Sequence, residues 1–227
     1  MTITLGAVSF SEGAITVRER YDEVGGRDER RVDLHGLLQR KPGGPPLQEQ
    51  LDAILAEASA EDYSAVLSLR PGRGLYVRRV GFSREPGADG ATAAFTLNLA
   101  TREPFEYALT PTEIAWPNIT PEAQLAIPVD GNAFTLPVIT IMADAELVKP
   151  ALSDGEAALT YDGVVENGGS LVIDATQGAV LLGGDDVTPY TSGVFPRLHP
   201  PETTLTFTTN DNAGAAQGGV WFRPRWW

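Results

Sequence analysis

The chain has 227 residues, of which 42% are hydrophobic and 21% are charged, a composition typical of a folded protein and too apolar for a disordered one. It contains no cysteine, which excludes a disulfide framework and a thiolate metal site. The N-terminus lacks the pattern of a secretion signal, and no apolar run reaches about 18 residues. We therefore expect neither classical secretion nor membrane insertion.

The formal net charge of −13 is unevenly distributed along the chain. Residues 104–227 carry 15 Asp and Glu but only 4 Lys and Arg, whereas residues 1–103 carry 15 and 13. Nucleic-acid binding requires clustered cations that neutralise phosphates. The acidic balance therefore predicts that DNA is not a bound ligand.

The first half of the chain alternates between strand patterns and one helical pattern. Apolar residues recur at helical spacing from Leu47 to Ala58, directly after a proline-glycine breaker. A hairpin is expected around the glycine-containing turn Arg70–Gly74, and Arg27–Arg31 is expected to be a solvated charge run. The other strands are expected at residues 2–10, 14–19, 32–36 and 91–100. Residues 1–103 therefore predict an α+β domain in which one helix lies against a sheet.

The segment Glu103–Pro121 is rich in prolines, and the charge balance changes within it. We place the domain boundary there and predict domains at residues 1–103 and 104–227. Beyond it, short apolar runs follow one another with turn residues between them, which is typical of a β-sandwich or jelly roll. These runs are residues 124–129, 134–142, 156–161, 170–174, 179–182, 203–208 and 219–222. The predicted fold class is mainly β.

Common enzyme signatures are missing from the sequence. There is no nucleophile elbow, zinc-protease helix, phosphate-binding loop or dinucleotide fingerprint. His35 and His199 have no partner motif, so we interpret them as structural. Asp185 and Asp186 form an acidic pair without the spaced ligands of a calcium loop, which favours a turn. We predict no catalytic, cofactor-binding or metal-binding residues, although a carboxylate pair of the glycosidase type would leave no local motif.

Arginines are densest around the predicted hairpin. This cluster has two open interpretations: charges that protect an exposed strand from unwanted pairing, or a subunit interface, since arginine is enriched at protein contacts. The candidate interface residues are Arg70, Arg73, Arg78 and Arg79, with Arg84 nearby.

Three of the four tryptophans lie in the last seven residues. A terminal strand with large aromatic side chains tends to dock, because a free tail of this kind would expose an apolar patch. We interpret the end of the chain as a docking strand within or between subunits, with Trp221, Phe222, Trp226 and Trp227 as the docking residues.

The second half also resembles a known protein family in the order of its motifs. The motifs are Ser170–Asp174, Ala179–Gly183, Ser192–Pro196, Thr203–Phe207 and the closing Trp221–Trp226. Together they resemble the C-terminal half of distal tail proteins from long-tailed, siphovirus-like phages. The order of elements in the first half is similar to the ring-forming N-terminal domain of that family, and the loop Asn210–Gly218 reads as a longer insertion.

The resemblance implies a structural role without a reaction. It implies a homohexameric ring that joins the tail tube protein to the tail hub protein and leaves a channel through which DNA passes as cargo. The C-terminal domains, similar to galectin-like sandwiches, would carry receptor-binding or side-fibre proteins. The protein would be made in the bacterial host cytoplasm and reside in the virion, at the distal end of the tail.

Two other functions remain as alternatives. A carbohydrate-binding module of a tail or baseplate protein would present an exposed aromatic residue to sugars, and Trp116 is the candidate. A glycan hydrolase would need a pair of acids, and the sequence singles out none.

Overall fold

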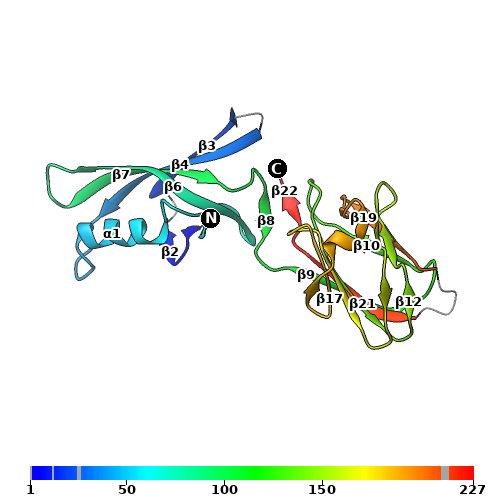
Figure 1. Cartoon of the computed structure of the whole chain (residues 1–227). Helices are drawn as coiled ribbons and strands as arrows, with labels where there is room; N and C mark the ends of the chain where they lie inside the picture. Colours follow the sequence, from blue (N-terminus) through cyan, green and yellow to red (C-terminus); the bar gives the residue numbers. More distant parts are fainter. Residues whose placement is uncertain (1, 12, 25–26, 211–214) are drawn as a thin grey trace. The chain divides into compact units, whose positions relative to one another are not determined.

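The computed structural model describes residues 2–11, 13–24, 27–210 and 215–227 (Figure 1). The chain folds into two compact units, Met1–Leu109 and Thr110–Trp227, each built around its own hydrophobic core. The division lies inside the segment Glu103–Pro121, beyond residue 103. The described part of the chain is mainly β with one α-helix, which confirms the predicted fold class.

The N-terminal unit is an antiparallel sheet with strand order β2-β1-β5-β6-β7-β4-β3, and β8 pairs with the start of β6. The central pairs are long, with β4 matched to β7 over nine residues from Arg31 to Gln39. The strands are β1 (Ile3–Leu5), β2 (Val8–Phe10), β3 (Ile15–Val24), β4 (Arg27–Gln39), β5 (Ala65–Ser68), β6 (Arg73–Pro86), β7 (Thr92–Thr101) and β8 (Glu106–Ala108).

The helix α1 (Leu47–Glu57) forms where the apolar spacing predicted it. It begins after Pro46, whose fixed φ of −54° suits the entry to a helix. Leu51 and Ile54 are its buried residues, and they share one core with strand residues such as Leu34 and Leu97, both fully buried. The helix therefore covers the apolar side of the sheet (Figure 1).

Two predictions for the first half were wrong. Residues 2–10 form two short strands instead of one, because the chain turns at Gly6 with a φ of +53° that favours glycine. The solvated charge run expected at Arg27–Arg31 is instead the start of β4. Arg30 is only 1% exposed, since its cation is paired inside the domain.

The C-terminal unit is a sandwich of two antiparallel sheets. One has the order β10-β20-β13-β14-β19 and the other β18-β17-β16-β11-β21-β9, with a separate pair β12-β15. The strands are β9 (Thr112–Ile119), β10 (Gln124–Pro128), β11 (Val138–Ala143), β12 (Leu147–Val148), β13 (Ala151–Ser153), β14 (Ala158–Tyr161), β15 (Val164–Val165), β16 (Ser170–Asp174), β17 (Ala179–Leu182), β18 (Asp185–Asp186), β19 (Thr191–Gly193), β20 (Glu202–Thr208), β21 (Ala216–Phe222) and β22 (Arg225–Trp226).

The core of this sandwich draws side chains from both sheets. Ile139 and Ile141 of β11 join Leu205 and Phe207 of β20 within one buried cluster. Alternate residues along each strand enter this core, as the period of two requires. The predicted sandwich is thus present, and its second sheet includes a strand that the sequence left as a linker, β9.

Three details of the second half differ from expectation. The strand predicted from residue 134 begins only at Val138, because Pro137 lacks the amide that a ladder needs. The long loop expected at Asn210–Gly218 is shortened, since β21 begins at Ala216, and residues 211–214 lie outside the described residues. Trp116 lies on β9 and is 3% exposed, so it belongs to the core and presents no face to a sugar.

We expect a cavity in one core to destabilise only the unit that contains it. Replacing Ile54 by Ala should lower the free energy of unfolding of the N-terminal unit by about 2–4 kcal/mol, because the truncated side chain leaves a void. All four tryptophans lie between residues 116 and 227, so their fluorescence reports chiefly on the C-terminal unit. In denaturant titrations, the circular dichroism signal of the variant should begin to fall at a lower denaturant concentration than that of the unchanged chain. The midpoint of the tryptophan fluorescence transition should stay the same. An equal shift of both transitions would mean that the units unfold together.

Candidate interaction surfaces

A buried cation lies on the β3-β4 hairpin of the N-terminal unit. The guanidinium of Arg30 donates through Nε to Glu19 Oε2 at 3.1 Å, through Nη1 to the Pro104 carbonyl at 3.1 Å and through Nη2 to Glu106 Oε1 at 3.0 Å. Glu106 is only 2% exposed and also accepts from Arg70. The network thus joins β3 and β4 to β8, where the chain leaves the unit.

The arginines of the predicted hairpin have different surroundings within the chain. Arg70 bonds to Glu106 within the chain, although 46% of its side chain is exposed. Arg78 lies with its guanidinium 5.3 Å from the centre of the Tyr63 ring. Arg73 lies at the start of β6, and Arg70 precedes the strand. Arg78 and Arg79 are consecutive in β6, so their side chains point to opposite faces, and the four arginines do not form one flat row.

The terminal aromatic run begins in β21, which lies between β11 and β9 in the C-terminal sandwich. Phe222 is fully buried, whereas 53% of Trp227 is exposed. The Thr135 hydroxyl donates to the Arg223 carbonyl at 2.6 Å, and the Trp227 amide donates to Asn132 Oδ1 at 2.8 Å. A Cβ atom at Gly131 would lie 2.2 Å from the Arg225 carbonyl oxygen, so only glycine fits beside this segment. The docking role of Trp221 and Trp226 remains a prediction.

Both histidines have structural partners. His35 Nδ1 lies 3.1 Å from the Thr96 hydroxyl on the neighbouring strand, and the His199 amide donates to the Thr203 hydroxyl at 2.6 Å. Nearby, partial burial would raise the pKa of Asp154, but the amides of Arg197, Ala157 and Glu156 hold it below its ordinary value. These hydrogen bonds stabilise a turn.

The acidic pair Asp185 and Asp186 forms the short strand β18, which pairs with β17. Asp186 accepts from the Thr188 amide at 2.9 Å, as in a turn. Among the described residues, no three His, Asp or Glu side chains gather closely enough to bind a metal ion. No helix in this part of the chain is long and apolar enough to cross a membrane.

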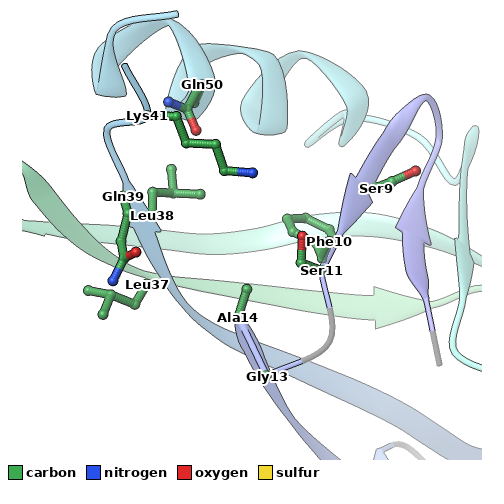
Figure 2. A pocket seen from close by; sticks show the side chains of 10 residues that line it. All are labelled: Ser9, Phe10, Ser11, Gly13, Ala14, Leu37, Leu38, Gln39, Lys41 and Gln50. Carbon is green, nitrogen blue, oxygen red and sulfur yellow. The ribbon is translucent and has the colours of Figure 1, made fainter. Parts of the chain in front are cut away.

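A pocket of about 460 Å³ lies in the N-terminal unit between the β2-β3 connection, the end of β4 and α1. Figure 2 shows Lys41 extending between Gln50 of the helix and the strand residue Leu38. The described residues that line it are Ser9, Phe10, Ser11, Gly13, Ala14, Leu37, Leu38, Gln39, Lys41 and Gln50. Lys41 is the one charged side chain among these described residues.

Sequence reasoning missed two of these features. The pocket is formed by segments that are distant along the chain, and no local pattern marks it. The inward direction of Arg30 could have been predicted from one pattern. Arg30, Val32 and Leu34 are alternate residues of one strand, so they point to the same face of the sheet.

The match to a known protein family concerns the C-terminal part of the chain. Residues 130–226 match the family model described as siphovirus-type tail component, C-terminal domain. The matched segment contains all the motifs on which the resemblance was based. No curated protein sequence matches this chain.

Over its whole length the chain resembles a solved structure, that of the Dit (gp 19.1) protein of SPP1, described as a paradigm of the hub adsorption apparatus in phages that infect Gram-positive bacteria. The alignment covers 99% of this chain and 98% of that chain, with a TM-score of 0.64 and 14% sequence identity. At this identity the match shows a common fold. The suspected resemblance to tail proteins is thereby confirmed by the domain family and by the fold.

Two glycoside hydrolases align much more weakly. A fructan 1-exohydrolase IIa from Cichorium intybus has 10% identity and a TM-score of 0.27, with 94% of this chain and 49% of that chain covered. An exo-inulinase from Aspergillus awamori has 8% identity and a TM-score of 0.26, with 94% and 59% covered. TM-scores this low do not indicate a common fold.

The buried cation network generates a stability prediction. Replacing Arg30 by Ala should lower the free energy of unfolding of the N-terminal unit by about 3–5 kcal/mol, because Glu106 would lose a partner inside the protein. Arg84→Ala, which removes an exposed arginine on β6, is the control and should change it by about 0.5 kcal/mol or less. Denaturation followed by circular dichroism measures both. Equal effects of the two substitutions would show that burial of the cation does not matter.

Proposed function

We propose that this chain, which carries a siphovirus-type tail-component domain at residues 130–226, is the subunit of a homohexameric ring at the distal end of a phage tail. The observation that carries the proposal is the end-to-end fold match to a phage hub protein. The ring joins the tail tube protein to the tail hub protein and leaves a channel for DNA. Its role is structural, and it belongs to the virion.

The N-terminal sheet has the two open edges that a ring of this kind needs. Strands β2 and β3 end the sheet, and within the described residues each pairs with one neighbour only. An open edge is a template for pairing with another strand. When the β3 edge of one copy meets the β2 edge of the next, the contact is head to tail, and such contacts close into a ring if the rotation between copies allows it.

Charge supports DNA as cargo and not as a ligand. The subunit has a formal net charge of −13, and neither half carries an excess of cations: residues 1–103 have 15 acidic and 13 basic residues, and residues 104–227 have 15 and 4. Without such an excess the phosphate backbone is not held. The C-terminal sandwiches carry receptor-binding or side-fibre proteins in this proposal.

Purified at high concentration, the chain should form rings of about 145 kDa, six copies of 24.2 kDa each. Light scattering coupled to size exclusion gives the mass, and electron microscopy of tails gives the symmetry. Ring formation depends on concentration, because association and folding are linked. A particle in which this chain occupies a ring with another number of copies contradicts the hexamer.

The arginine interface is tested by reversing its charge. Arg78→Glu combined with Arg79→Glu should keep the circular dichroism spectrum and abolish the hexamer peak, because interface arginines paired with acids of a neighbour would become repulsive. The matched control is Lys149→Glu with Arg197→Glu, which makes the same change in net charge at two exposed residues of the sandwich. Normal rings from the first variant would remove these arginines from the interface.

A further inference from the structure

The two outer faces of the C-terminal sandwich differ in chemistry. On the sheet β10-β20-β13-β14-β19, the outward residues are short and mostly polar, and they are Gln124, Ala126, Ala151, Ser153, Ala158, Thr160, Thr204, Thr206 and Thr208. This is an ordinary solvated surface. The outward side of the other sheet carries a valine pair, a leucine, a methionine and a tryptophan, so it requires another explanation.

Strand register brings these apolar side chains together. On β11, Ile139 and Ile141 point into the core, so Val138 and Met142 point outwards. Val138 is opposite Trp221 of β21, and at the next outward position of β11 Thr140 is opposite Val172, which in turn faces Leu181 of β17. Met142 is the outward residue after Thr140, and it is opposite Ser170 and Gln217. We call this set, Val138, Met142, Val172, Leu181 and Trp221, the apolar outer face.

The apolar outer face does not belong to the packing of the sandwich. None of its five residues is part of the buried core cluster or of the partly buried side chains packed against that cluster. Met142 is 48% exposed. Trp221 lies between Val138 of β11 and Glu113 of β9, and the next outward positions along β21 and β9 are the small residues Gly219 and Ala115.

Three carboxylates and one guanidinium border this face, and the guanidinium is that of Arg223, 5.5 Å from the centre of the Trp221 ring. Glu113 is opposite Trp221, Asp174 is opposite Val138, and Asp186 is opposite Leu181. All three carboxylates lie on the outward side, each opposite an apolar residue of the neighbouring strand. The Thr188 hydroxyl and amide hold the pKa of Asp186 below its ordinary value, which keeps this carboxylate charged in mildly acidic solution.

We propose that the apolar outer face docks a different protein of the tail, one that presents an apolar centre with lysine or arginine at its rim. The proposal rests on the proposed function, since it assumes that the chain sits in a tail. Trp and Met are enriched at the centres of protein interfaces, and charge complementarity at the rim selects the partner. Two copies of this face would oppose carboxylate to carboxylate, which disfavours self-association through it.

The absence of cysteine from the sequence makes the test direct. Met142→Cys places one thiol on the apolar outer face, and Thr206→Cys places one on the polar outer face as the matched control. Each variant is labelled with a maleimide as purified chain and again within isolated tails. We expect position 142 to react about tenfold more slowly in tails than in the purified chain, because a covered thiol is protected, and position 206 to change less.

A benzophenone maleimide attached to the thiol of the Met142→Cys variant then identifies the covering surface. The expected product is a crosslink to a different tail polypeptide, at an apolar residue flanked by Lys or Arg. Equal labelling in both states, or a crosslink only to this chain, whether to a second copy or to its own N-terminal unit, would overturn the proposal. Failure of the chain to enter tails at all would instead contradict the proposed function, so the two failures are distinguishable.

A charge substitution gives an independent readout. Met142→Glu should leave folding intact, because the side chain is half exposed, and should remove the crosslinked protein from isolated tails, since it adds a carboxylate to the apolar centre. Thr206→Glu, with the same added charge on the other face, should retain that protein. Retention by both variants contradicts the assignment of the face.

Discussion

The buried guanidinium of Arg30 constrains the N-terminal unit more than any other single group described above. A cation removed from water must have all its donors satisfied, and the cost of leaving a buried charge unpaired is several kcal/mol. Its partners come from β3, from the Pro104 carbonyl and from Glu106 on β8. The hairpin at the sheet edge and the exit of the chain are therefore fixed by the same group. A bond from the Thr101 hydroxyl to the Arg30 carbonyl at 2.9 Å adds the end of β7.

This constraint explains which features were predictable from the sequence. The helix α1 and the strands β5 to β7 follow from local periodicity and turn chemistry, and they lie where the pattern placed them. The partner of Arg30 could not be predicted, because Glu106 is 76 residues away along the chain. The boundary segment was interpreted as a linker for a related reason. Prolines suggested a break, but the edge strand β9 tolerates Pro117, and Trp116 is buried on its inner side.

The interaction surfaces were predictable only in part. The aromatic end of the chain stands out by composition, and its motifs led to the correct domain family. The apolar outer face leaves no such signal, because β11 (Val138–Ala143) is apolar at five of its six positions and β16 (Ser170–Asp174) at its three central ones. Such a run does not reveal which side faces the core. Only the register of neighbouring strands, and the cluster that fills the interior, separates Ile139 and Ile141 from Val138 and Met142.

The last full strand shows how one segment serves both stability and contact. In β21, Val220 and Phe222 are fully buried in the sandwich, whereas Trp221 between them faces outwards, with the Arg223 guanidinium 5.5 Å from its ring centre. Alternation along a strand thus places a core residue and a surface residue next to each other in the sequence. A change at Phe222 acts through the core, whereas a change at Trp221 alters the outer surface of the sheet. The same strand therefore closes the sandwich and contributes the tryptophan of the surface for which a partner is proposed.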